Sequence, residues 1–387
     1  MSCNNRSRPE ETSVISLSEE RAPVLCNSKR MTSSVSIILF KCMCWIGLIK
    51  ESNRHLSHRV AALTIKMILI LVNLEMWISS VVTFRFSDWK FTFFFLAPHL
   101  LTSVIYFAVY FKRNLIKITI HKLDELSESF NTIVINLITI VVCCTLMVLL
   151  TFQIIQFHHG HWDIAYIINL PYDITGMLLI CTKSMFGFLV YPTLIYLVSL
   201  LYCVLCQSCC YQINNLTKEI SQVSPEEFDP IQQMDVLRQK ARIDDVLKNV
   251  QAIFSVPSFF IIAVNVLKCG SLLEIFTGNT WENSSLFRNM EVVLYSLTSF
   301  CCLFIVSWVA GGLPIQMKQL KKEFNEKVRS RLLCTRNLGE IQPKNNLFGQ
   351  SDFAFTGCNI IIFNRNIILK ISAFLIIYAF LPSPERI

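Results

Sequence analysis

The stretch TIVINLITIVVCCTLMVLLTFQIIQF, residues 132–157, contains no acidic or basic side chain and is long enough to cross a hydrocarbon core of about 30 Å as a helix. Six further apolar runs of comparable length lie on either side of it, separated by polar segments. In lipid a segment must satisfy its own backbone hydrogen bonds, which favours helices. We therefore predict an all-α membrane protein with seven transmembrane helices, at residues 59–84, 91–110, 132–157, 174–205, 252–276, 290–313 and 353–381.

The basic residues between the runs fall almost entirely on one side of the predicted membrane. Most of the 35 Lys and Arg residues lie in the N-terminal segment and in the second, fourth and sixth loops. Cytoplasmic loops carry the excess of Lys and Arg in membrane proteins. We therefore expect a cytoplasmic N-terminus and, after seven spans, an extracellular C-terminus. This orientation is the inverse of that of a G-protein-coupled receptor.

The composition agrees with a chain embedded in a lipid bilayer. Hydrophobic residues make up 53% of the chain and charged residues only 16%. The net charge of +8 comes from residues that flank membrane runs, so no nucleic-acid partner is predicted. The polar segment 1–34 lacks the apolar core and the cleavage site of a signal peptide. In the fifth loop Asn283-Ser284-Ser285 forms a sequon, and we predict glycosylation at Asn283.

The fourth and sixth loops, 206–251 and 314–352, are long, charged and predicted to be cytoplasmic. Apolar residues recur at helical spacing in 234–250 and again in 316–333. Both loops are therefore expected to prolong the membrane helices into the cytoplasm and to pack together there. Such a helix is most often only a packed surface, and its use as a contact between subunits is the narrower alternative.

Charged side chains inside the apolar runs point to function more directly than the loops do. One unpaired charge at mid-membrane costs at least about 2.5–3.5 kcal/mol, so such residues are expected to have a role that offsets this cost. Charged and polar residues gather in the predicted outer halves of the helices: Glu75, His99, Gln153, Gln156, Lys183, Asn265, Lys268, Glu274, Tyr295 and Thr298. We predict an outward-opening ligand pocket lined by Glu75, His99, Gln153, Lys183, Asn265 and Tyr295. In the alternative, Lys268 and Glu274 extend to the interface and the amides bond between helices.

Cysteines and histidines invite other readings. None of the 16 cysteines lies in a predicted outer loop, so disulfides are not expected. One cluster lies at the end of the fourth span: Cys203, Cys206, Cys209 and Cys210. These thiols could bind zinc or be palmitoylated, but the preferred interpretation is that they are unmodified small apolar side chains. The third loop begins with His158-His159-Gly160-His161-Trp162-Asp163, which offers metal ligands but is more typical of a membrane interface. We predict neither a metal nor a cofactor.

No enzyme is predicted, because the sequence contains no phosphate-binding glycine loop, no HExxH and no nucleophile elbow. Motifs of G-protein-coupled receptors are also missing. No Asp-Arg-Tyr follows the third span, and no Asn-Pro-x-x-Tyr ends the seventh.

The C-terminal segment carries a family resemblance. Phe355-Thr356-Gly357-Cys358-Asn359, then Phe363-Asn364-Arg365, then the apolar stretch 367–378 resemble the closing signature of arthropod gustatory receptors. The predicted spans, orientation, short outer loops and long inner helices resemble that family along the whole chain. The family pattern ends in Thr-Tyr, five apolar residues and Gln-Phe. Tyr378 matches the Tyr of this pattern, whereas the positions of its Thr, Gln and Phe hold Ile377, Pro384 and Glu385.

The resemblance implies a ligand-gated, non-selective cation channel of the plasma membrane, opened by a small-molecule tastant. It implies a homotetramer, or a hetero-oligomer with related subunits, with the ligand in the outer half of the bundle. The seventh helix would line the pore with Ser372, Ile376, Tyr378 and Ala379 on or near it. Phe355, Thr356 and Arg365 would form its cytoplasmic elbow.

The chain then divides into four parts: a cytoplasmic segment 1–58, helices one to six with the ligand bundle at 59–313, a cytoplasmic anchor at 314–352, and the pore helix with its tail at 353–387. Pro382 limits the last apolar stretch. We therefore expect a subunit that assembles but conducts poorly. The alternative is a seven-span transporter without channel activity, although the internal repeats and broken helices typical of transporters are not evident in the sequence.

Overall fold

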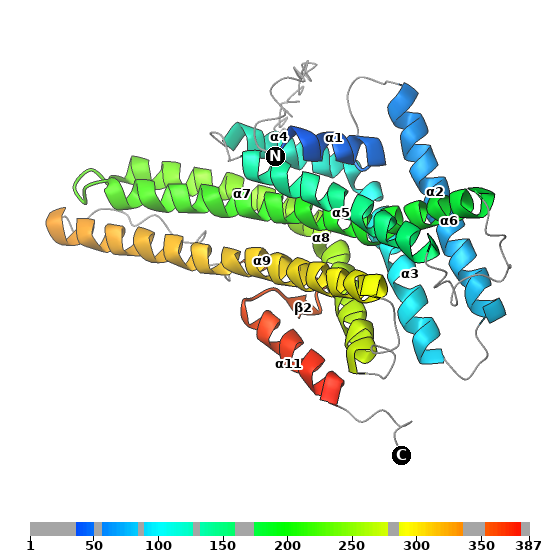
Figure 1. Ribbon diagram of the computed structural model, residues 1–387. Coiled ribbons are helices and arrows are strands. Elements are labelled where there is room, and N and C mark those ends of the chain that lie inside the picture. The colour runs from blue at the N-terminus through cyan, green and yellow to red at the C-terminus, as the bar shows by residue number, and fades with distance from the viewer. Residues whose placement is uncertain are drawn as a thin grey trace, which may run out of the picture.

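The computed structural model describes residues 36–49, 56–83, 89–126, 132–158, 174–277, 286–335 and 353–380, which form helices and one small hairpin (Figure 1). In chain order the helices are α1 (Ile37–Ile46), α2 (Leu56–Thr83), α3 (Trp89–Phe111), α4 (Arg113–Leu126), α5 (Thr132–His158), α6 (Ile174–Phe188), the π-helical turn η2 (Leu189–Leu194), α7 (Ile195–Gln222), α8 (Pro230–Thr277), α9 (Leu286–Thr335) and α11 (Asn366–Phe380). The strands β1 (Thr356–Gly357) and β2 (Ile361–Ile362) pair antiparallel between α9 and α11.

Five of the seven predicted runs lie almost entirely within one helix each: 59–84 in α2, 91–110 in α3, 132–157 in α5, 252–276 in α8 and 290–313 in α9. The seventh run, 353–381, was predicted as one helix, but it is helical only from Asn366, because the hairpin of β1 and β2 occupies the part before it. Five helical segments of the described residues are long and apolar enough to cross a membrane: Arg59–Ile78, Thr132–Gln156, Ile174–Gln222, Pro230–Leu273 and Leu286–Cys334. The apolar parts of α3 and α11 are shorter, at Leu96–Phe111 and Asn366–Ile377. Only 22% of the most apolar window of α2 and 17% of that of α5 is buried, against 83% for the window that includes α7. The protein is thus a multi-pass membrane protein with α7 at its centre and α2 and α5 facing lipid.

The fourth run was expected to be one helix, and the structure breaks it. Tyr191 has φ −136° and ψ 123°, an extended conformation between α6 and α7. The residue before a proline is disfavoured in the helical region, and Pro192 has no backbone N–H to donate. The kink turns the Tyr191 side chain into the interior, where it is 4% exposed.

The predicted extension of the membrane helices beyond the apolar runs is confirmed. Helix α8 runs without interruption from Pro230 to Thr277, and α9 continues to Thr335. The far ends of α7, α8 and α9 project together at the left of Figure 1. Asp229 caps α8 by accepting a hydrogen bond from the Gln232 N–H at 2.7 Å, and proline follows at the first helical position.

The ends of α7 and α9 are joined beyond the apolar part of the bundle. The Lys327 ammonium donates to the carbonyls of Ser221 at 3.1 Å and Val223 at 2.7 Å, where α7 ends. The Phe228 ring meets the Phe324 ring edge-on, with centroids 5.6 Å apart, and both side chains are buried. These contacts join α9 to the end of α7 and to the turn that leads into α8, outside the apolar spans.

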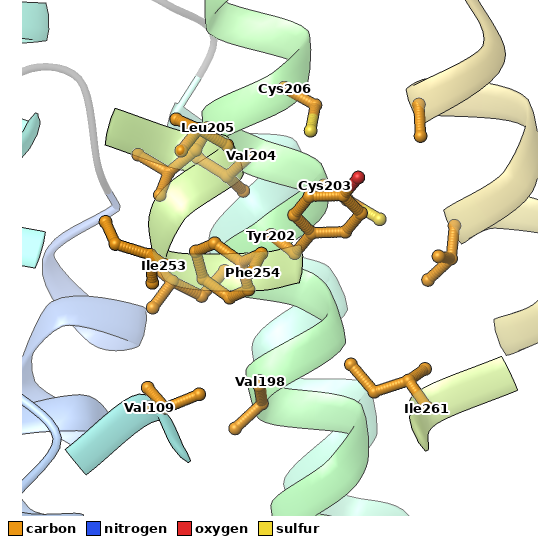
Figure 2. Close-up of a cluster of buried hydrophobic side chains, with 14 of the residues drawn as sticks. Val109, Val198, Tyr202, Cys203, Val204, Leu205, Cys206, Ile253, Phe254 and Ile261 are labelled. Carbon is orange, nitrogen blue, oxygen red and sulfur yellow. The ribbon is translucent and has the colours of Figure 1, made fainter. Parts of the chain in front are cut away.

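The core centres on α7. Figure 2 shows the ring of Tyr202 of α7 beside that of Phe254 of α8, with centroids 5.0 Å apart, and Cys206 further along α7. Cys203, Cys206 and Cys209 are free thiols, each at most 6% exposed, and Cys210 is half-buried. The first three are therefore packed as small apolar side chains, which is the preferred reading of this cluster.

Two helices were not predicted. Helix α1 lies in the segment assigned to the cytoplasm, and the Ile38 N–H donates to the Asn136 side chain of α5 at 3.3 Å. Gly47 ends α1 with a φ of 82°, a left-handed position that favours glycine. Helix α4 buries Ile116, Ile120 and Leu123, and Lys122 pairs with Asp245 of α8 at 2.5 Å.

Candidate functional site

A carboxylate of α9 holds the end of α5. Gln153 donates from Nε2 to both oxygens of Glu291 at 3.2 Å, and Gln156 donates to Glu291 Oε2 at 2.9 Å. Glu291 also interacts electrostatically with Lys268, near the end of α8. Because α5 and α8 end where α9 begins, all four side chains lie at one end of the bundle. That end is opposite the long extensions and is extracellular in the predicted orientation.

Aromatic rings adjoin these charges. The rings of Tyr191 and Tyr295 are nearly parallel, 5° apart, with centroids separated by 6.4 Å. Lys268 Nζ lies 4.9 Å from the Tyr295 centroid and 5.9 Å from that of Tyr191, within the range of a cation–π interaction. The His99 ring meets Tyr191 edge-on at 5.9 Å. We call these seven residues the polar cluster: His99, Gln153, Gln156, Tyr191, Lys268, Glu291 and Tyr295.

Asn265 lies one helical turn deeper on α8 and is fully buried. Its Nδ2 donates to the Ile261 carbonyl at 2.8 Å and lies 3.6 Å from Cys302 Sγ. Cys302 in turn donates to Ser199 at 3.4 Å. Asn265 thus links α8 to Cys302 of α9, and through it to Ser199 of α7, beneath the polar cluster. Its Oδ1 is buried without a hydrogen-bond partner among the described residues.

Glu75 and Lys183 form an ion pair between α2 and α6. Their side chains are 37% and 28% exposed, respectively. The sequence placed both residues in the same ligand pocket as His99 and Tyr295. In the structure each of them has an oppositely charged partner in the other.

The elbow residues meet α7, α8 and α9. Phe355 is buried, and its ring lies edge-on to Tyr202 at 5.9 Å. Thr356 is hydrogen-bonded to the Gln251 side chain, and the Cys358 N–H donates to the Ser255 carbonyl at 2.9 Å. The hairpin turns at Cys358 and Asn359, with φ of 51° and 57°. It follows that the segment before α11 is fixed mainly to α8.

Arg365 ends the elbow on α9. Its guanidinium carbon lies 4.2 Å from the centre of the Trp308 ring. The backbone at Asn364 and Arg365 packs directly on Gly311, since a Cβ at Gly311 would lie 2.8 Å from the Arg365 nitrogen. Only a residue without a side chain permits this approach.

Helix α11 buries one face and leaves the other uncovered. Ile367 and Leu375 face the bundle, and Ser372 is partly buried at their flank. The uncovered face carries Asn366, Leu369, Lys370, Ala373, Phe374, Ile376 and Ile377. Tyr378 and Ala379 belong to the last turn of α11. The Tyr378 side chain, the Glu274 side chain, Asn283 and the end of the chain from 381 lie outside the described residues.

Sequence reasoning missed Glu291 and Tyr191. Glu291 lies at the edge of an apolar run, where charged residues are common, so its position alone does not mark it as part of a site. Its role becomes visible only from its hydrogen bonds to Gln153 and Gln156, which are far away in the sequence. Tyr191 had a signal in Pro192, which predicts a break in the helix. Within the described ranges, no group of three His, Cys, Asp or Glu side chains is placed to hold a metal ion.

The arrangement offers aromatic faces, one cation and amides that donate hydrogen bonds, in a largely apolar setting. Such a combination suits the binding of a small organic molecule.

No protein-family model matches the sequence, and a search of curated proteins found no match. Among solved structures the chain is similar to the insect olfactory receptor OR5 from Machilis hrabei, with a TM-score of 0.65 at 14% identity, covering 91% of this chain and 96% of that one. It is similar to the same receptor in complex with eugenol, with a TM-score of 0.65 at 13% identity and the same coverage. The predicted fold is confirmed: the chain has the seven-helix membrane fold of an insect chemoreceptor.

Proposed function

We propose that this chain is a subunit of a chemosensory receptor that acts as a ligand-gated, non-selective cation channel in the plasma membrane. The observation that carries the proposal is the likeness to an insect olfactory receptor over 91% of this chain and 96% of that receptor. Ligand binding belongs to the bundle 59–313, anchoring to 314–352 and conduction to 353–387.

The uncovered face of α11 supports assembly into an oligomer. Leu369 is 70% exposed and Ile377 is 63% exposed, although both lie on an apolar helix. A helix that lines a pore shared by several subunits needs a face that its own subunit leaves open. A homotetramer, or a hetero-oligomer with related subunits, places that face on a central axis.

A small organic molecule is the ligand class that we propose. One structure of the similar receptor holds eugenol. The polar cluster supplies the parallel rings of Tyr191 and Tyr295 for stacking, and Lys268 and Glu291 for polar groups. The closing segment from Phe355 to Arg365 favours a taste receptor, opened by a tastant, over an olfactory one.

Whole-cell recording from cells that express the chain, against a panel of tastants, tests the proposal. We expect ligand-evoked currents that reverse near 0 mV with sodium or potassium as the charge carrier. Tyr295→Ala should shift the half-maximal ligand concentration by about ten-fold or more, because a buried aromatic contact is lost. Leu297→Ala, on the same helix but 60% exposed, is the matched control and should leave it unchanged. Saturable uptake of a labelled solute without current would indicate a transporter instead.

A further inference from the structure

Two cations from different helices converge on one tyrosine at the end of the bundle opposite the polar cluster. Lys66 Nζ of α2 lies 3.9 Å from the centre of the Tyr110 ring. Arg113, the first residue of α4, donates from Nη1 to the Tyr110 hydroxyl at 2.9 Å, and its guanidinium carbon is 4.5 Å from the ring centre. All three side chains are partly buried. The phenol therefore gathers two positive charges into one small volume.

No carboxylate balances these charges among the described residues. The ion pairs there join other residues, such as Lys122 with Asp245 and Lys183 with Glu75, and none includes Lys66 or Arg113. The Tyr110 oxygen accepts from Arg113, which leaves the phenolic proton free to be donated elsewhere. Three groups that can donate hydrogen bonds thus meet at one place, where the Tyr110 oxygen accepts from Arg113 and no described carboxylate neutralises the two positive charges.

The place lies at the edge of the hydrocarbon core. Lys66 belongs to the candidate span Arg59–Ile78, and Arg113 follows directly on the apolar segment Leu96–Phe111. Leu63 and Met67 beside Lys66, and Phe111 beside Arg113, are at least half exposed. A cationic centre bordered by uncovered apolar side chains matches an amphiphile with an anionic head and apolar tails. In the predicted orientation this edge faces the inner leaflet, where anionic lipids are concentrated.

We propose that Lys66, Tyr110 and Arg113 bind the phosphate of an anionic phospholipid headgroup. The planar guanidinium of Arg113 can hold two phosphate oxygens, the Lys66 ammonium adds a second charge, and the Tyr110 hydroxyl donates a third contact. The bound lipid offsets the free energy of keeping two cations at the membrane edge without a described carboxylate beside them. It also bridges α2 to the junction of α3 and α4.

The site reaches further into the fold through Tyr106. The Tyr106 ring stacks on Tyr110 with centroids 6.0 Å apart, and its hydroxyl donates to the Ile46 carbonyl at 3.0 Å, at the end of α1. A headgroup that fixes Tyr110 therefore also steadies the contact between α3 and α1.

Native mass spectrometry of the purified chain tests the site, after exchange into mixed micelles that contain phosphatidic acid or phosphatidylcholine. We expect retained phosphatidic acid on the wild-type chain and about ten-fold less on Lys66→Gln/Arg113→Gln, because both charge-assisted contacts are lost. Tyr110→Phe keeps the ring and should lose part of the binding. Lys318→Gln, which removes an exposed charge at the same side of the membrane, should bind as the wild type does.

Two results would overturn the site. One is equal retention of phosphatidic acid and phosphatidylcholine by the wild type. The other is equal phosphatidic acid binding by the wild type and the double variant. Glycerol 3-phosphate, which carries the same phosphate without the acyl chains, distinguishes a lipid from a soluble ligand. If it binds as tightly as phosphatidic acid, the ligand is a free phosphate compound and the lipid proposal is wrong. If the double variant elutes as an aggregate, Arg113→Lys decides: it keeps the charge but loses the paired contact, and undiminished binding by it would contradict the proposed geometry.

Discussion

Gln251 and Thr356 are joined by three hydrogen bonds. Gln251 Nε2 donates to the Thr356 carbonyl at 2.9 Å and to its hydroxyl at 2.6 Å, and the Thr356 N–H donates to Gln251 Oε1 at 3.0 Å. The side-chain amide of a helix thereby pairs with β1 as a neighbouring strand would. This contact ties the elbow before α11 to α8, the helix that also carries Lys268.

Gln251→Glu is expected to loosen the elbow. The carboxylate cannot donate, so the Thr356 carbonyl loses its partner and faces a negative charge, which costs about 1–3 kcal/mol for one buried unsatisfied group. The unfolding temperature of the detergent-purified protein should fall. Gln232→Glu changes an exposed side chain on the same helix and is the control. Equal melting of both variants would show that the three bonds contribute nothing to stability.

Gly311→Ala and Gly312→Ala should act in opposite directions. Alanine is favoured over glycine in a helix by about 1 kcal/mol, so both changes favour α9 locally. At Gly311, however, a Cβ would stand 2.8 Å from the Arg365 nitrogen, whereas at Gly312 the nearest atom is the tip of the Arg365 side chain, 4.0 Å away. We expect Gly311→Ala to lower the melting temperature and Gly312→Ala to hold or raise it. The same rise in both would contradict the close packing of α11 on α9.

Glu75→Lys and Lys183→Glu should each lower the yield of folded protein, and the two changes together should restore it, because the ion pair is then re-formed with its charges exchanged. Each single reversal places two like charges together between α2 and α6, and an unpaired charge within the membrane costs at least about 2.5–3.5 kcal/mol. The yield of monodisperse protein should fall for the single variants and recover for the double one. Reversal of the exposed pair Lys322 and Glu326 is the control. Normal yields for both single variants, with altered ligand responses, would show that the ion pair is dispensable for folding and would favour the predicted place of both residues in the ligand pocket.

Lys370→Ser should increase cation current if α11 lines the pore. Lys370 lies on the uncovered face of α11, so four copies would form a positive ring, which repels cations. Current density at equal surface expression is the measurement, and Lys318→Ser is the control for charge outside the pore. If the current is unchanged by this substitution, the uncovered face of α11 does not line the pore.

An epitope at the N-terminus should be labelled only after permeabilisation, and one after Ile387 should be labelled on intact cells. This follows from the excess of basic residues in alternate loops. Labelling of the N-terminus on intact cells would reverse the topology and remove the channel proposal. A tag placed in the segment 127–131, between α4 and α5, provides an independent inner site.

The sequence predicted the helices well because lipid imposes a single strong rule on apolar runs. It also predicted the long α8 and α9, since apolar spacing in 234–250 and 316–333 continues past the membrane segments. It missed α1 because that helix has only 10 residues and gains its stability from α5 and α2. The hairpin escaped prediction because the turn at Cys358 and Asn359 needs left-handed backbone that the pattern of apolar residues does not encode.

The candidate site was harder to predict. His99, Gln153 and Tyr295 were selected by depth alone, and they do lie together in the polar cluster. Glu75 and Lys183 were selected by the same rule, and they form an ion pair with each other. Depth along a helix can be read from a sequence, but the direction in which a side chain points around the helix depends on its neighbours.

Helix α11 is fastened at its base, where the hairpin grips α8 and the elbow rests on Gly311 of α9. Beyond this base α11 packs on the bundle through one face only, with Ile367 and Leu375, so a tilt of the base would carry the whole helix with it. A helix of 15 residues is about 22 Å long, so a tilt of about 5° at the base moves its far end by about 2 Å. A shift in α8 too small to disturb its own packing thus becomes, at the tip of α11, a displacement comparable with the radius of a partly hydrated ion.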